Sequence, residues 1–313
     1  MISIILLSYK SENRILNFYK ELNNRLIKEG IEYELIIMDD GSNDSSYEIA
    51  LDLEQKNKNI RSFQLSKNYT SHYSIFAGFS KVRGNCAVAL PDDFQVPLDT
   101  VVDMFKSWKK GYKVVIPFRD ARNDPLVSKF FSNLYYSIMN TFSEVRFPKG
   151  GADIFLADRE IIEIFNKHIH AKNTSTIIEV LRLGFDPVYI PYNRPMGSNK
   201  KSRWTLRKKF KLALDTFFAS SSFPIKFISG LGISSFILTI FLIAYYITAR
   251  VTGIIEIPGW TLLVITFTFF SGLILLSLGI IAEYVWRIFD EVKGRPGFII
   301  KEKNIPTQYH SDE

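Results

Sequence analysis

The sequence contains only one cysteine, Cys86, among its 313 residues, and only four histidines. A single thiol excludes a disulfide framework and a cysteine-built metal site, and it favours a reducing compartment. Any bound metal is therefore expected to be a hard cation with oxygen ligands. Neither a Gly-x-Gly-x-x-Gly fingerprint nor a Walker loop is present. Their absence argues against a dinucleotide dehydrogenase and a P-loop nucleotide hydrolase.

Charge is missing from two long hydrophobic stretches in the C-terminal third. Residues 223–249 contain one charged side chain, Lys226, and residues 257–282 contain none. Each stretch exceeds the roughly 20 residues that a helix needs to cross a hydrocarbon core. We expect transmembrane helices at 223–249 and 257–286, joined into a hairpin. A pair of buried core helices is the alternative.

Basic residues gather on the outer sides of this predicted hairpin. They are Lys200, Lys201, Arg203, Arg207, Lys208, Lys209 and Lys211 before it, and Arg287, Lys293, Arg295, Lys301 and Lys303 after it. The loop between the spans has only Arg250. The positive-inside rule then places both termini in the cytoplasm, with 287–313 as a tail. We expect 199–222 to form a basic juxtamembrane helix against anionic lipid.

Two further observations bear on targeting and on the partner. The N-terminal run "ISIILLS" is too short for a secretory signal and has no basic region before it. The formal charge of +7 indicates an anionic partner. A nucleic acid is not expected, because the basic run adjoins an apolar span and anionic lipid is the simpler partner.

The first part of the chain, 1–198, alternates apolar runs with amphipathic stretches. The apolar runs lie at 2–8, 33–40, 60–66, 85–93 and 112–118, and the helical patterns at about 16–26, 42–56, 71–82 and 98–110. Buried strands that alternate with helices predict an α/β domain with a mostly parallel sheet. Ligands of such sheets bind beyond the carboxyl ends of the strands.

Polar side chains occur where several of these predicted strands end. Ser8 and Tyr9 end the first, Asp39 and Asp40 the second, Asp92 and Asp93 the fourth, and Arg119 the fifth. We expect these groups to converge on one rim of the sheet. By themselves, the carboxylates of "ALPDDFQVP" (89–97) fit either a surface turn or a cradle for a metal ion and a phosphate. The stretch "DDGSND" alone is more typical of a capping device.

The segment 124–147 has an aromatic-rich apolar face that is interrupted by Lys129 and Ser132. It fits a core helix and a helix on the membrane surface equally well. His72, in "NYTSHYS", is the best histidine candidate for a general base, but a structural or nucleotide-side role is the simpler reading.

The motifs together resemble a known family. The order "DDGSND", "NY..H....AG" and "DDFQVP" resembles the family 2 glycosyltransferases, which have the A-type nucleotide-sugar fold. The later stretches "KSRWTLRKKFKLALD", "SSFPIKFISGLG" and "GIIAEYVWRIFDEVKGRPGFII" resemble the polyprenyl-phosphate glycosyltransferases, including the bactoprenol and dolichol-phosphate types. The resemblance covers nearly the whole chain.

The resemblance implies roles for individual residues. Nucleotide-sugar contacts are implied for Ser8, Tyr9, Glu12, Asp39, Asp40, Asn68 and Arg203. It implies that Asp93 and Gln95 hold Mg²⁺ or Mn²⁺ on the diphosphate, with Asp92 beside them. It also implies that basic and polar groups after the fifth strand grip the lipid phosphate: Arg119, Arg122, Lys129 and Ser132.

The implied reaction moves one sugar from a nucleotide donor, expected to be UDP-linked, to polyprenyl phosphate, with inversion. A phosphate monoester already carries an oxyanion near neutral pH, so no protein base is required. The expected location is the cytoplasmic face of a bacterial inner membrane, and homo-oligomerisation is left open. Two alternatives remain. A membrane polysaccharide synthase is disfavoured because Lys200 replaces the usual glutamine before Arg203. A degenerate lipid-binding member is suggested by Pro91 at the usual first acidic position.

Overall fold

The computed structural model describes residues 1–119, 137, 141, 152–172, 174–193, 223–252 and 259–302. The chain divides into two compact units, Met1–Ala219 with Pro296–Glu313, and Ser220–Arg295.

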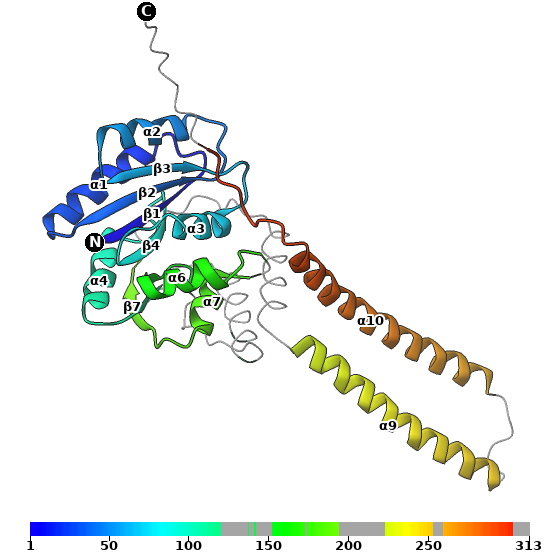
Figure 1. The fold of residues 1–313 in the computed structure, drawn as a ribbon. Coiled ribbons are helices and arrows are strands. Elements are labelled where there is room, and N and C mark those ends of the chain that lie inside the picture. The colour runs from blue at the N-terminus through cyan, green and yellow to red at the C-terminus, as the bar shows by residue number, and fades with distance from the viewer. Residues whose placement is uncertain are drawn as a thin grey trace, which may run out of the picture. The chain divides into compact units, whose positions relative to one another are not determined.

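The first unit is built on a seven-stranded sheet with the order β3-β2-β1-β4-β6-β5-β7 (Figure 1). The strands are β1 Ile2–Ser8, β2 Tyr33–Asp39, β3 Ile60–Gln64, β4 Cys86–Pro91, β5 Val114–Arg119, β6 Leu156–Asp158 and β7 Val188–Tyr192. Only β6 runs antiparallel to its neighbours, β4 and β5. The mostly parallel α/β sheet predicted from the sequence is confirmed. The sequence did not predict β6, because three residues are too short for a recognisable period.

Helices cover both faces of the sheet, as the apolar runs of its central strands require. These helices are α1 Ile15–Lys28, α2 Ser46–Lys56, α3 Ser71–Phe79, α4 Leu98–Lys109, α6 Arg159–His168 and α7 Thr176–Arg182. One apolar cluster joins α1, α2 and α4 to one face, and a second joins α3, α6 and α7 to the other. Side chains of β1 alternate between them, with Ile4 and Leu6 in one cluster and Ile5 in the other.

The second unit consists of α9 Phe223–Val251 and α10 Trp260–Val292 (Figure 1). Helices were predicted in both places, but α10 continues beyond residue 286, the predicted end of the second span. Within the described residues, the stretch Phe269–Val292 is long and apolar enough to cross a membrane. Large apolar side chains of α10, such as Phe267, Leu275 and Trp286, are exposed.

Candidate active site

The ends of β1, β2, β3 and β4 form one rim. In the sheet register Ser8 is the partner of Asp39, Asp39 is the partner of Gln64, and Leu7 is the partner of Pro91. The convergence of the polar residues after these strands is therefore confirmed. Arg119 ends β5 at the same rim, but β6 separates β5 from β4.

Asp93 and Gln95 present their side chains to one another at the end of β4. Nε2 of Gln95 donates to Oδ2 of Asp93 at 2.6 Å, and Asp93 is exposed. Between them Phe94 has φ 52°, a left-handed conformation that is uncommon for an aromatic residue. Its ring stacks on buried Phe18 at 5.2 Å between centroids. Packing of Phe94 thus offsets the backbone strain of the turn that holds the two polar side chains together.

An exposed carboxylate beside a carboxamide fits a hard divalent cation. Such cations take oxygen ligands, and Mg²⁺ commonly uses one or two protein groups while phosphates and water complete its shell. Within the described residues no group of three or more His, Cys, Asp or Glu side chains could hold a metal. The donor set of Asp93 and Gln95 therefore suits a cation that is shared with a diphosphate.

Asp92 contacts other side chains, and these contacts join two loops. Its Oδ2 accepts a short hydrogen bond from the Ser11 hydroxyl and another from Nε of Arg14 at 2.9 Å. Nη2 of Arg14 also lies 2.8 Å from that oxygen. Burial raises the pKa of Asp92, against the opposing effects of Ser11 and Arg14. These contacts fasten the turn after β4 to the loop after β1, and the catalytic role expected for Asp92 stays a prediction.

Asp40 caps a neighbouring turn. Its two carboxylate oxygens accept from the backbone N–H groups of Tyr69 and Thr70, at 2.7 and 2.9 Å. Thr70 has φ 84°, so this cap supports a strained residue. Burial raises the pKa of Asp40, and adjacent Asp39 adds to the rise.

Asp39 is fully buried and organises the loop that follows β2. Its Oδ1 accepts from Oγ of Ser42 at 2.6 Å, while Oδ2 accepts from the Ser42 N–H at 2.9 Å and from Nε2 of Gln64 at 3.0 Å. Gly41 has φ +65°, and a Cβ there would lie 2.5 Å from the carbonyl carbon of Lys67. Only glycine fits this point of the loop without a shift of the backbone.

The remaining residues expected on the nucleotide side surround this loop. Ser8 is buried, and its Oγ has no hydrogen-bond partner in the described part of the chain. Tyr9 is half-buried, while Glu12 and Asn68 are exposed. Glu12 accepts from the Ser45 N–H at 3.3 Å, which connects the loops after β1 and β2. Arg203 lies outside the described residues.

On the acceptor side, the structure places one of the four predicted residues. Arg119 is half-buried, and its Nε donates to the hydroxyl of Tyr192 on β7 at 3.2 Å. Arg122, Lys129 and Ser132 lie outside the described residues, as does most of the segment 124–147.

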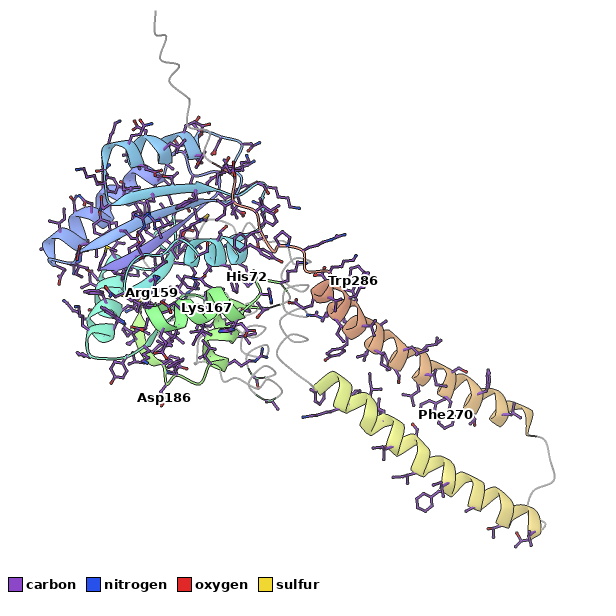
Figure 2. The ribbon with its side chains drawn as sticks, in the orientation of Figure 1. His72, Arg159, Lys167, Asp186, Phe270 and Trp286 are labelled. Carbon is purple, nitrogen blue, oxygen red and sulfur yellow. The ribbon has the colours of Figure 1, made fainter. Side chains whose placement is uncertain are left out.

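His72 lies on α3 (Figure 2) and packs against Tyr73 and Phe76. Its Nε2 lies 2.8 Å from the carbonyl oxygen of Ala171, so this nitrogen carries the hydrogen and donates it. Burial lowers the pKa of His72 and so favours the neutral ring. These contacts are those of a structural histidine.

Sequence reasoning missed the partners that hold the acidic residues. Ser11, Arg14 and Gln64 are polar residues outside the quoted motifs, and Ser42 lies within "DDGSND" but had no role assigned to it. The roles of Ser11, Arg14 and Gln64 come from contacts across long separations in the chain, such as Ser11 with Asp92. A sequence pattern carries no signal for such contacts.

A family model for glycosyl transferase family 2 matches residues 3–163, which span β1 to α6 and so include the whole rim except β7. The chain belongs to glycosyl transferase family 2. It is a glycosyltransferase with the A-type α/β fold, and the family resemblance of its motifs is confirmed.

This family 2 glycosyltransferase is similar to full-length relatives. It is 26% identical over 302 residues to an uncharacterised glycosyltransferase of Synechocystis sp., covering 96% of this chain and 95% of the relative. It is 24% identical over 307 residues to the SfII prophage-derived bactoprenol glucosyl transferase of Shigella flexneri, covering 97% and 98%. A crystal structure of glucosyl-3-phosphoglycerate synthase from Mycobacterium tuberculosis with uridine diphosphate aligns at TM-score 0.47 and 16% identity, covering 68% of this chain and 76% of that one.

Proposed function

We propose that this glycosyltransferase moves one sugar from a nucleotide sugar to polyprenyl phosphate, with inversion, at the cytoplasmic face of a bacterial inner membrane. The observation that carries the proposal is the match to the bactoprenol glucosyl transferase of Shigella flexneri over 97% of this chain. That match extends beyond the sheet to the α9 and α10 regions. The aligned region therefore includes both the catalytic unit and the segments that form α9 and α10 in this chain.

The acceptor chemistry suits the side chains at the rim. A phosphate monoester has a second pKa of about 6, so its oxyanion attacks without a protein base. His72 donates to a backbone carbonyl, and Asp40 and Asp92 already accept hydrogen bonds from their neighbours. A mechanism that needs no positioned base is consistent with these contacts.

The leaving group is a nucleoside diphosphate, whose negative charge grows as the bond to the anomeric carbon breaks. In this proposal Asp93 and Gln95 hold Mg²⁺ or Mn²⁺, which would supply positive charge beside that diphosphate. The exposure of Asp93 and its contact with Gln95 support the assignment. Asp92 keeps the turn in place through Arg14.

The nucleoside of the donor is assigned to the loops after β1 and β2. Tyr9, Glu12 and Asn68 offer side chains that are at least partly accessible there. Ser8 contributes a buried hydroxyl that has no partner among the described residues. Asp39 is fully buried and Asp40 nearly so, and their hydrogen bonds hold these loops in shape; the nucleotide contact expected for them stays a prediction.

The lipid phosphate is assigned to Arg119, together with Arg122, Lys129 and Ser132. A guanidinium can bind two phosphate oxygens at once, and its positive charge offsets the repulsion between acceptor phosphate and donor diphosphate. The contact with Tyr192 orients Arg119 at the rim.

The membrane part of the proposal is a hairpin of two spans. The stretch Phe269–Val292 qualifies by length and composition. Within Phe223–Val251 only Lys226 and Arg250 are charged, and both lie near the helix ends. Basic residues outside the hairpin favour a cytoplasmic catalytic unit, and anionic lipid is its expected neighbour.

The direct test uses the purified full chain in lipid nanodiscs with undecaprenyl phosphate, Mn²⁺ and radiolabelled nucleotide sugars. The proposal expects label in an organic-extractable product that carries one sugar per lipid, with the anomeric configuration opposite to that of the donor. Polymer formation would instead indicate a polysaccharide synthase. A nanodisc preparation that binds nucleotide sugar but never labels the lipid would overturn the acceptor assignment.

A further inference from the structure

The chain that leaves α10 returns to the sheet of the first unit. Residues 297–301, called the strap here, pass the end of the edge strand β3 (Figure 1). Ile300 forms an antiparallel bridge with Leu65. The Ser66 N–H donates to the carbonyl of Ile299, and the Lys301 N–H to the carbonyl of Gln64, both at 2.8 Å. Main-chain hydrogen bonds therefore hold the strap to the end of β3 and to the two residues that follow it.

Side chains hold the strap in register. Phe298 and Ile300 pack against the apolar cluster on the α3 face of the sheet. At the other end Gly297 sits closely on α3 and the chain after α6, because a Cβ there would lie 3.1 Å from Cβ of Ala171 and 3.4 Å from Cε1 of Tyr73. Apolar packing and main-chain hydrogen bonds together fix the position of Lys301.

From Lys301 a line of hydrogen bonds leads to the loop after β1. Nζ of Lys301 donates to Oε1 of Gln64 at 3.0 Å, and Nε2 of Gln64 donates to Oδ2 of Asp39 at 3.0 Å. Oγ of Ser42 donates to Oδ1 of Asp39 at 2.6 Å and accepts from the backbone N–H of Lys10 at 2.9 Å. Lys10 follows Tyr9 directly and has φ 51°.

Lys301 and Asp39 together fix the orientation of the Gln64 amide. An ammonium group has donors only, so it requires the oxygen of the amide on its side and turns the NH₂ group toward Asp39. Without that ammonium only the contact with Asp39 favours this orientation, so the amide is held by one side chain instead of two. If it flips, its oxygen meets the carboxylate of Asp39 and the two acceptors repel one another. The buried carboxylate then loses a donor, which is costly in a low-dielectric interior.

We propose that Lys301 is a positioning residue for the nucleotide donor: through Gln64, Asp39 and Ser42 it holds the loop that carries Tyr9 in its binding conformation. This inference rests on the proposed function, which assigns the nucleoside to that loop. The strap thereby makes donor binding depend on a segment that follows α10 in the chain. The group that transmits the effect is the Gln64 amide.

The test compares four versions of the full chain in nanodiscs: wild type, Lys301→Met, Lys301→Arg and Lys58→Met. Lys58 is an exposed lysine at the opposite end of β3 and serves as the matched control for loss of one charge. UDP and GDP are titrated separately with Mn²⁺ by calorimetry, and KM values for donor and acceptor are measured with kcat. We expect Lys301→Met to raise the Kd of the nucleotide that wild type binds, and the donor KM, by roughly three- to tenfold. Acceptor KM and kcat stay unchanged, Lys301→Arg recovers most of the loss, and Lys58→Met behaves as wild type.

A double-mutant cycle identifies the route. If Lys301 acts through Gln64, then Gln64→Met weakens nucleotide binding, and adding Lys301→Met to it causes no further loss. If the losses of nucleotide binding caused by Gln64→Met and Lys301→Met add fully in the double variant, the proposed route through Gln64 is wrong. An unchanged nucleotide Kd in Lys301→Met, or a fall in kcat alone, would overturn the inference while leaving the proposed function intact. Failure of wild type to bind any nucleotide would count against the proposed function itself.

Discussion

Gln95 donates its amide hydrogen to Asp93 across a left-handed Phe94, with 2.6 Å between Nε2 and Oδ2. The adjacent Asp92 is bound to Arg14 and is largely buried, while Asp93 is exposed. Neighbouring carboxylates thus have different tasks: Asp92 holds the turn, and Asp93 is left available for a ligand.

Asp93→Asn removes the charge but keeps the shape of the side chain. We expect sugar transfer to fall by about 100-fold or more, because the leaving diphosphate loses its metal-borne stabilisation. The loss should come with weaker Mn²⁺ dependence, measured by transfer rate against Mn²⁺ concentration. Asp103→Asn, an exposed aspartate on α4, is the control and should behave as wild type. Activity and Mn²⁺ dependence that both survive in Asp93→Asn would refute the metal assignment.

Arg119→Ala should mainly impair use of the lipid acceptor. We expect the KM for undecaprenyl phosphate to rise roughly tenfold or more, since a charge-assisted contact to phosphate is lost. Donor KM should change little. Arg83→Ala removes an exposed arginine at the other end of the sheet and tests for a general effect of charge. Equal changes in donor and acceptor KM would contradict the assignment of Arg119 to the acceptor side.

Gly41→Ala tests how tightly the loop after β2 is packed. The alanine must adopt φ near +65°, which costs about 1–2 kcal/mol, and its Cβ would also overlap the backbone of Lys67. We expect a loss of unfolding free energy of about 3 kcal/mol or more, measured by denaturant unfolding in detergent. Gly30→Ala is the control, because Gly30 has φ +64° with nothing within 4 Å and should cost only the backbone strain. Equal losses at the two positions would mean that the contact with Lys67 is unimportant.

Glu29 provides a test at low pH. Hydrogen bonds from Lys106 and then Arg25 lower its pKa from 4.5 to about 2. A depressed folded-state pKa stabilises the fold above the unfolded value of 4.5, and this stabilisation is lost as pH falls from 4.5 toward 2. Glu29→Gln should therefore lower Tm by about 1–3 °C at pH 7, with the difference shrinking below pH 4.5 and reduced by salt. A difference that persists undiminished at pH 3 would exclude this linkage.

Membrane topology can be tested by maleimide labelling of cysteines that are introduced by substitution. Native Cys86 is buried, and burial raises the pKa of its thiol to about 12, so it reacts poorly with maleimide. In spheroplasts, an impermeant maleimide should label Thr252→Cys but not Glu302→Cys, which should react only after permeabilisation. Cys86→Ser with no added thiol gives the background. Labelling of both introduced thiols in intact spheroplasts would contradict the proposed hairpin.

Much of the fold was predictable because its signals are local. Runs such as Ile2–Ser8 are mostly apolar, since both faces of a central parallel strand are covered, and α1 repeats buried residues at helical spacing. The ends of β1, β2 and β4 were found for the same reason. The short antiparallel β6 was not, because its place in the sheet depends on neighbours rather than on its own composition.

The sequence by itself determined the parallel α/β domain, the rim where its polar residues gather and the two apolar stretches. Each of these follows from the pattern of apolar and polar residues within short segments of the chain. Tertiary structure alone decided that Asp93 is exposed while Asp92 binds Arg14, and that Lys301 reaches Gln64. Those outcomes depend on which distant segments the folded chain brings within hydrogen-bond distance. A single sequence does not encode that information in any local pattern.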